Sequence, residues 1–264
     1  MIGGGVMGEA ILSRLLAQKI YLPEQILVSE PQLQRREFLS QRYGIEVVAE
    51  NQKVAAVAGV LFLAIKPQVF DTVAIDLISR RTTASAPLII SILAGVSLSR
   101  LEAIFPNHPV IRAMPNTPAT VGAGITAISP GQHTQPSHLE QAHRIFGAVG
   151  EVVEVPESLM NAVTGLSGSG PGYIAIAIEA LTDGGVAAGL PRSIAAKLAL
   201  QTVRGTAQLL QESGMHPAEL KDRVTSPGGT TIAGIAHLEQ SAFRSALITA
   251  VQVACQRSQE LGQS

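Results

Sequence analysis

The sequence predicts an α/β domain with a mostly parallel, doubly wound sheet over residues 1–156, followed by an all-helical domain over residues 157–264. Three observations predict this order. Short runs rich in β-branched residues alternate with helical patterns up to about residue 155. Two of these runs are apolar almost throughout, which is typical of strands covered on both faces. After Glu157 the alternation fades, and long segments rich in Ala, Leu and Gln take over.

The strands of the α/β part are expected where apolar runs end in polar or turn-forming residues. Helical stretches such as 31–43 and 138–149 lie between them. Strands that alternate with helices favour a doubly wound sheet. The candidate strands span residues 25–31, 44–48, 60–67, 87–96, 109–116, 124–129 and 150–155.

The helical part opens with the small residues of TGLSGSGP, 164–171. Pro171 suits the first turn of a helix, so we expect a tight loop before it that exposes backbone N–H groups. The first long helix, 171–190, is apolar nearly all round and therefore has to be buried. Further helical segments are expected at 191–213, 216–229 and 230–261.

Composition narrows the function classes. Apolar residues make up 46% of the chain and charged residues 15%, which favours burial of apolar surface in an oligomer. A net charge of −1 without a basic block argues against nucleic acid and anionic membrane as partners. The longest apolar run, 54–65, is too short for a bilayer. Cys255 is the single cysteine, so we expect no metal site that uses cysteine pairs and a protein of the reducing cytoplasm. We also expect no signal peptide, because none precedes the first glycines.

The chain begins MIGGGVMGEA, with glycines spaced as Gly3-x-Gly5-x-x-Gly8. This spacing lets the backbone turn tightly and approach a pyrophosphate, which the helix N-terminus then binds. The run at 25–31 follows at the distance of a second strand, so we expect a Rossmann dinucleotide site.

Only Met1 and Ile2 precede these glycines, although the strand at this place is central in the fold. Two residues cannot form such a strand, so the first strand is expected to be largely missing. The simplest explanation is a misassigned start or a trimmed chain. If the chain does start at Met1, we expect backbone groups without a partner strand in the middle of the sheet and weak cofactor binding. Adding about five apolar residues upstream should then raise the affinity for the cofactor.

The choice between NAD and NADP depends on Ser29, Glu30, Arg35 and Arg36. An acid at the end of the second strand usually accepts a hydrogen bond from the ribose 2′-OH, so Glu30 favours NAD. Arg35 and Arg36 lie one turn into the next helix and are equally compatible with a bound phosphate or with a solvated surface. The preference therefore stays open.

A second anion site is expected at VTSPGGTTIAGI, 224–235. Gly228 and Gly229 turn the chain, and Thr230 and Thr231 open a helix whose N–H groups suit a carboxylate. The usual catalytic groups are missing from this loop and from TGLSGSGP. The histidines lie in polar or loop surroundings, where solvation is the simpler interpretation.

Several stretches together resemble the Δ1-pyrroline-5-carboxylate reductase family, within the larger group of 6-phosphogluconate dehydrogenase-like enzymes. The resemblance runs from Ile2 to about Leu261. The related β-hydroxyacid dehydrogenases place a lysine on the helix after the glycine-rich loop, and Tyr173–Leu181 contains none. The stretches are MIGGGVMGEA, VLFLAIKPQ, SILAGVS, VIRAMPNTPA, AVTGLSGSGPGY, DGGVAAGLPR and LKDRVTSPGGTTI.

The resemblance implies hydride transfer from NADH or NADPH to the C=N bond of 1-pyrroline-5-carboxylate, giving proline. A cyclic imine arrives protonated, so it needs binding and orientation more than a general acid. This agrees with the missing catalytic His or Lys. The alternatives are a β-hydroxyacid dehydrogenase of the same architecture and a non-catalytic dinucleotide-binding protein.

The resemblance also implies roles for individual residues in catalysis, substrate binding and cofactor binding. Thr231 would face the ring nitrogen or the carboxylate, and Glu157 would approach the ring nitrogen and favour the iminium. The helical domains of two subunits would interlock as a homodimer or larger homo-oligomer. The substrate carboxylate would lie at Ser226, Gly228, Gly229, Thr230 and Thr231. The cofactor would contact Ile2, Gly3, Gly4, Gly5, Val6, Met7, Gly8, Ser29, Glu30, Asn51, Ala64, Ile65, Lys66, Pro67, Ala94, Met114 and Asn116.

Overall fold

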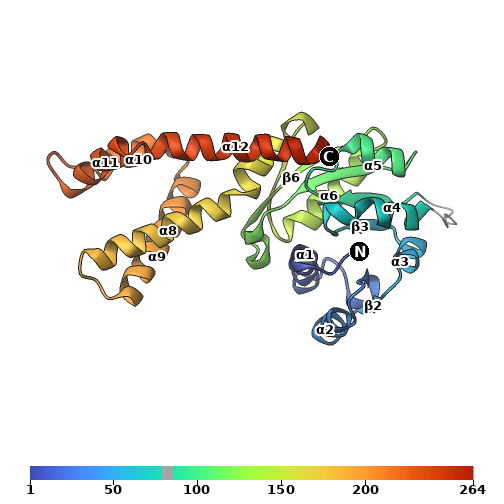
Figure 1. Cartoon of the computed structure of the whole chain (residues 1–264). Helices are drawn as coiled ribbons and strands as arrows, with labels where there is room; N and C mark the ends of the chain where they lie inside the picture. Colours follow the sequence, from blue (N-terminus) through green and yellow to red (C-terminus); the bar gives the residue numbers. More distant parts are fainter. Residues whose placement is uncertain (79–85, 264) are drawn as a thin grey trace. The chain divides into compact units, whose positions relative to one another are not determined.

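The computed structural model describes residues 1–78 and 86–263. Contacts divide the chain into two compact units, one formed by residues 1–169 with 253–264 and the other by residues 170–252. The first unit contains the whole sheet, and the second is helical (Figure 1). The predicted α/β domain followed by an all-helical domain is confirmed.

The sheet is parallel except at one pair of strands, as predicted. β3, β4, β5, β6 and β7 are neighbours in that order, and only β5 and β6 run antiparallel. β1 and β2 form a separate parallel pair. Each predicted run corresponds to one strand, and β6 extends one residue beyond its run: β1 Leu27–Ser29, β2 Glu46–Val48, β3 Val60–Leu63, β4 Leu88–Ser91, β5 Val110–Met114, β6 Gly124–Pro130 and β7 Gly150–Glu154.

Helices cover the sheet in the first unit and make up the second. Ser97 caps α5 by accepting from the Arg100 amide, and Gly44 ends α2 in the left-handed conformation with a φ of 67°. The helices of the α/β part are α1 Val6–Ala17, α2 Leu33–Tyr43, α3 Asn51–Val57, α4 Phe70–Ile78, α5 Leu98–Ile104 and α6 Pro136–Gly147. The later helices are α7 Met160–Val163, α8 Gly170–Ala187, α9 Arg192–Ser213, α10 Pro217–Arg223, α11 Thr230–Gln240 and α12 Phe243–Gln263.

Apolar side chains alternate between the two faces of the sheet and build one cluster on each. Leu61, Leu63 and Ile89 belong to the cluster on one face. Phe62 and Ile90 belong to the cluster on the other. Successive residues of a strand point to opposite faces, so a buried sheet needs apolar residues at every position.

The TGLSGSGP segment differs from the prediction of an open loop with free N–H groups. Residues Thr164–Gly168 form a π-helical turn between α7 and α8, and the Ser169 amide donates to the Thr164 carbonyl at 2.9 Å. Small side chains allow the helix to widen here instead of stopping. The prediction of a tight loop with exposed backbone N–H groups at this segment is therefore wrong.

The segment 230–261 is also not one helix. Ala242 adopts a φ of 57° and separates α11 from α12. No glycine or proline marks this break in the sequence.

The missing first strand is represented by a single paired residue. Ile2 bridges to Ser29 of β1 and to Leu63 of β3, and so joins the two groups of strands. The Ile2 amide donates to the Phe62 carbonyl at 2.7 Å, and the Ala64 amide donates to the Ile2 carbonyl at 2.8 Å. The expectation that nothing could pair here is too strict, because Ile2 pairs on both sides.

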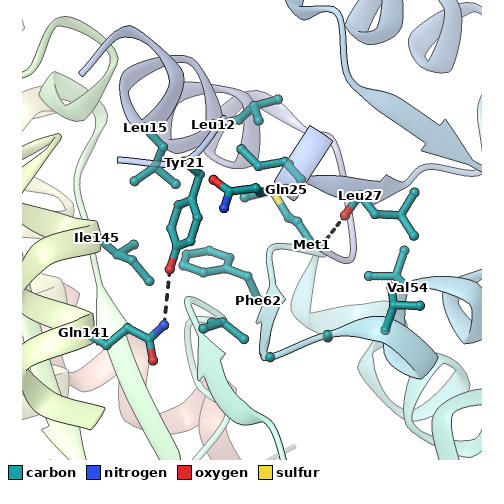
Figure 2. Close-up of a pocket in the computed structure, with 15 residues that line it drawn as sticks. Met1, Leu12, Leu15, Tyr21, Gln25, Leu27, Val54, Phe62, Gln141 and Ile145 are labelled. Carbon is teal, nitrogen blue, oxygen red and sulfur yellow. Dashed lines mark hydrogen bonds between the residues drawn. The ribbon is translucent and has the colours of Figure 1, made fainter. Parts of the chain in front are cut away.

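A cavity of about 310 Å³ lies beside Met1 and is lined by residues of β1 and β3, among them Leu27 and Phe62. Figure 2 shows Met1, Leu27, Val54 and Phe62 around this cavity. The Met1 amine donates to the Leu27 carbonyl at 2.6 Å. Burial lowers the pKa of this amine from 8.0 to about 5.

Candidate active site

The glycines of the first loop have two different surroundings: Gly3 and Gly8 lie against the protein backbone, and Gly5 faces open space. A Cβ on Gly3 would lie 2.7 Å from the Ala64 carbonyl oxygen, and one on Gly8 would lie 2.7 Å from the Gly3 oxygen. Gly3 also has a φ of 94°, which favours glycine. A Cβ on Gly5 would meet nothing within 4 Å. The loop therefore packs tightly on the end of β3 and leaves an open face at the N-terminus of α1, as a pyrophosphate requires.

Glu30 and the two arginines near it, Arg35 and Arg36, form hydrogen bonds within the protein. Glu30 is 8% exposed, and its two carboxylate oxygens accept from the amides of Gly4 and Gln32, each at 3.1 Å. Arg35 donates to the Gly4 carbonyl at 2.8 Å and pairs with Glu9. Arg36 donates to the Glu30 and Pro31 carbonyls. Both arginines are therefore bound to the protein and not simply solvated, and Arg36 uses a single nitrogen, Nη1, for its two bonds.

Glu9 is the acid that compensates the charge of Arg35. Burial by itself raises the pKa of Glu9, but hydrogen bonds from Tyr43 and Arg35 outweigh it and lower that pKa overall. Glu9 thus stays ionised and fixes Arg35 beside the glycine loop.

Ser29 and Asn51, both predicted as cofactor residues, lie next to each other. The buried Ser29 hydroxyl donates to Asn51 Oδ1 at 2.7 Å, and Asn51 Nδ2 donates to Asp76 at 3.2 Å. Asn51, the first residue of α3, is therefore oriented by β1 and α4.

The remaining predicted cofactor residues follow β3, β4 and β5, whose carboxyl ends meet at one edge of the sheet. Asn116 is held within the protein, because its amide donates to the Ser167 carbonyl at 3.2 Å and accepts from the Ile125 amide at 3.0 Å. The Met114 methyl would lie 2.9 Å from a Cβ on Gly168. Both side chains thus connect this edge to the segment around the π-helical turn. The predicted residues here are Ala64, Ile65, Lys66, Pro67, Ala94, Met114 and Asn116.

Glu157 is not a solvated surface acid. It opens the short turn Glu157–Leu159, and its Oε1 accepts from the Leu98 amide at 2.5 Å and from Arg112 at 3.0 Å. The side chain of Arg112 is 8% exposed and that of Glu157 is 31% exposed. The carboxylate is therefore compensated by a buried guanidinium.

The SPGGTT segment lies in the second unit and begins α11. Gly228 has a φ of 68°, and a Cβ on Gly229 would lie 2.3 Å from the Ser226 hydroxyl oxygen. In the part of the chain that the structure describes, no side chain caps α11, so its first N–H groups stay available. Thr230 is exposed and Thr231 is half-buried. The geometry suits a carboxylate placed against these amides.

Comparison with known proteins identifies the family. Residues 157–261 match the model described as pyrroline-5-carboxylate reductase dimerisation, and residues 1–95 match the one described as NADP oxidoreductase coenzyme F420-dependent. A pyrroline-5-carboxylate reductase of Synechocystis sp. is 62% identical over 99% of this chain and 97% of its own. The chain belongs to the pyrroline-5-carboxylate reductase family. The enzyme of that name from Arabidopsis thaliana is 41% identical over 100% of this chain and 95% of its own.

Solved structures of the pyrroline-5-carboxylate reductase family have the same fold. The structure from Coxiella burnetii is 34% identical and covers 100% of this chain and 97% of that one, with a TM-score of 0.91. The structure of the Plasmodium falciparum enzyme with NADP bound is 29% identical and covers 99% and 96%, with a TM-score of 0.89. Among the described helices of this family member, none is long and apolar enough to cross a membrane.

One site residue, Arg112, was missing from the sequence-based prediction of this reductase family member. The signal was present, because Arg112 interrupts the apolar strand VIRAM in the middle of the sheet. A buried arginine needs an acidic partner. The partner could not be found in the same way, because Glu157 is 45 positions away in the sequence.

Proposed function

We propose that the protein reduces the C=N bond of 1-pyrroline-5-carboxylate with NADH or NADPH and forms proline, the last step of proline biosynthesis. The full-length identity of 62% to a pyrroline-5-carboxylate reductase carries this proposal. The glycine loop supports it, because Gly3 and Gly8 pack against the protein while Gly5 leaves the pyrophosphate side open.

The residues present fit a dinucleotide. The loop Ile2–Gly8 would hold the pyrophosphate, and Ser29, Glu30 and Asn51 would hold the adenosine ribose. Ala64–Pro67 with Ala94, Met114 and Asn116 would surround the nicotinamide end. The nicotinamide supplies the hydride, and the protein orients it and excludes water.

The substrate carboxylate would bind at the start of α11. The amides of Thr230 and Thr231 and the Ser226 hydroxyl are the donors that such an anion needs, since the Gly229 amide already donates to the Ser226 carbonyl at 3.1 Å. The Thr231 hydroxyl would contact the ring nitrogen or the carboxylate and fix the orientation of the ring. A protonated imine is already an electrophile, so orientation replaces general acid catalysis.

The quaternary structure follows from the second unit and the family. Residues 157–261 match a dimerisation model, and helices of the second unit expose large apolar side chains such as Ile176 and Ile248. We infer a homodimer or a larger homo-oligomer through these helices. The single cysteine suits a reducing compartment, and we place the reaction in the cytoplasm.

The proposal is tested by oxidation of NADH and NADPH in the presence of 1-pyrroline-5-carboxylate. Thr231→Ala should lower kcat/KM by about ten-fold or more, as expected for a lost hydrogen bond of about 1.5–3 kcal/mol. Thr231→Ser, which keeps the hydroxyl, should retain most of the activity. A folded wild-type chain that binds the cofactor but oxidises neither nicotinamide would contradict the proposal. Equal rates for the Ala and wild-type chains would remove Thr231 from the mechanism.

A β-hydroxyacid dehydrogenase is the other enzyme of this architecture. Tyr173–Leu181 on α8 lacks the lysine that such an enzyme uses. A substrate screen with β-hydroxy acids beside the cyclic imine should therefore detect turnover only with the imine.

A further inference from the structure

The carboxylate of Glu157 joins three segments that are distant in sequence. Its Oε1 accepts from the amide of Leu98, the first residue of α5, at 2.5 Å. The same oxygen accepts from Arg112, in the middle of β5, at 3.0 Å. Glu157 itself begins the turn before α7. One oxygen atom therefore holds the start of α5 against the sheet and against the entry to the family's dimerisation segment.

Arg112 connects this half-buried carboxylate to the interior of the sheet. Arg112 pairs in register with Ser91 of β4 and Ser129 of β6, which are both buried. A guanidinium in such a place is unfavourable unless a carboxylate compensates it. Since Glu157 provides that compensation, little of its charge is left to attract a substrate iminium. The geometry thus argues against direct electrostatic catalysis by Glu157.

The segment fixed by Glu157 is the loop between β4 and α5, which contains Ala94. Gly95 in this loop has a φ of 77°, and a Cβ on Gly262 of α12 would lie 3.0 Å from the Gly95 carbonyl oxygen. The loop is therefore held by Glu157 at its end, beside Leu98, and by the end of α12 at Gly95. The end of α12 is itself fixed to α7, because Ser258 donates to Asn161 at 2.8 Å.

We propose that Glu157 is a positioning residue that fixes the Ala94–Leu98 loop through the Leu98 amide and Arg112, and that it does not touch the substrate. The inference rests on the proposed function, because that function places the nicotinamide ribose beside Ala94. A loop held from both sides keeps the reactive end of the cofactor in one orientation, which hydride transfer requires.

Three variants of the full chain test this role. Glu157→Ala removes the acceptor, so hydrogen exchange of the Leu98 amide in the cofactor-free protein should accelerate by about ten-fold or more. The KM for the nicotinamide should rise several-fold, and the pH profile of kcat/KM should keep its shape. Glu157→Gln keeps an oxygen for Leu98 and should restore slow exchange and most of the activity, but it leaves Arg112 without a carboxylate and should lower the stability of the fold. The double variant Arg112→Met with Glu157→Gln leaves no buried charge uncompensated, so it should recover this stability and otherwise behave like Glu157→Gln.

Glu154→Gln is the matched control, because Glu154 is an exposed acid that pairs with His143 on the surface. It should change neither exchange at Leu98 nor turnover. The inference is overturned if Glu157→Ala leaves Leu98 exchange unchanged. It is also overturned if Glu157→Gln loses as much kcat as Glu157→Ala while exchange stays slow, since the charge itself would then act on the substrate. If Glu157→Ala does not fold, the exchange rate of the Leu98 amide and the kcat of Glu157→Gln and of the double variant are compared with those of the wild-type chain. Slow exchange together with a large loss of kcat in these two variants would then overturn the inference. Hydrogen exchange needs no turnover, so failure of the inference is distinguishable from failure of the proposed reaction.

Discussion

Glu30 combines a structural and a selective role in a single side chain. Its carboxylate accepts from the amide of Gly4 within the glycine loop and from the amide of Gln32 at the start of α2. Arg35 and Arg36 beside it bind backbone carbonyls, and Arg35 also pairs with Glu9. A ribose 2′-phosphate would be repelled by the Glu30 carboxylate, whereas a 2′-OH can donate to it. We therefore predict that Glu30 disfavours NADPH relative to NADH.

Replacement of Glu30 by serine should shift the preference toward NADPH. Loss of the negative charge removes repulsion of the 2′-phosphate, and the ratio of kcat/KM for NADPH to that for NADH should rise by about ten-fold or more, which corresponds to about 1.4 kcal/mol. Steady-state rates with both cofactors measure this ratio. Glu37→Ser, at an exposed position of α2, is the control and should leave it unchanged. An unaltered ratio in Glu30→Ser would show that Glu30 does not select the cofactor.

At the scale of the elements, the sequence predicts those strands and turns that depend on the local pattern of apolar residues and glycines. The strands of the sheet were predictable because alternating or continuous apolar runs have few other stable solutions. The close packing of the backbone at Gly3 and Gly8 also agrees with the glycine spacing. The π-helical turn at Thr164–Gly168 was not predictable, because small residues suit both a loop and a widened helix.

The site residues contact residues that are distant in the sequence, and most of these contacts could not be predicted from the sequence. Glu157 matched a family acid, but its bonds to Leu98 and Arg112 arise only when β4 and β5 are neighbours. Asn116 similarly contacts Ser167, which is 51 positions away. Sequence similarity indicated that these residues belong to one site, and only the fold shows what their side chains bind.

The gap between β1 and β3 leads to a prediction about stability. The carbonyl of Phe62 faces Ile2, so the Phe62 amide and the Val60 carbonyl face the cavity beside Met1. Extending the chain before Met1 by about five apolar residues should pair these groups and fill the cavity. We expect the free energy of unfolding to rise by about 2–4 kcal/mol, the effect of burying one or two large apolar side chains. Urea unfolding measures this change.

The same extension should remove a dependence on pH. In the unextended chain the unfolded amine of Met1 takes up a proton as the pH falls below about 8, whereas the folded amine does so only near pH 5. Stability should therefore decrease between pH 8 and pH 5, and this loss should disappear when the amine is moved out of the sheet. A Gly-Ser extension of equal length is the control and should move the amine without filling the cavity. Equal stabilities for the two extensions would show that the cavity accepts no strand.

At the scale of the whole molecule, the second unit carries more apolar surface than a monomer needs. Ile176 on α8 is 67% exposed and Ile248 on α12 is 59% exposed, and the amide donors of the proposed substrate site lie in this same unit. Monomeric proteins rarely expose large apolar patches, so a partner subunit is expected on these helices. We therefore expect activity to depend on the association of two chains.

Ile176→Asp tests whether association and activity are coupled. A charge at a buried apolar contact should weaken the dimer by about ten-fold or more, corresponding to at least about 1.4 kcal/mol. Light scattering measures the mass, and specific activity should fall at the concentrations where the mass falls. Leu33→Asp, at an exposed apolar position of α2 in the first unit, should change neither. A folded Ile176→Asp chain that keeps the wild-type mass would exclude α8 from the interface. A monomer with full specific activity would instead show that each chain carries a complete site.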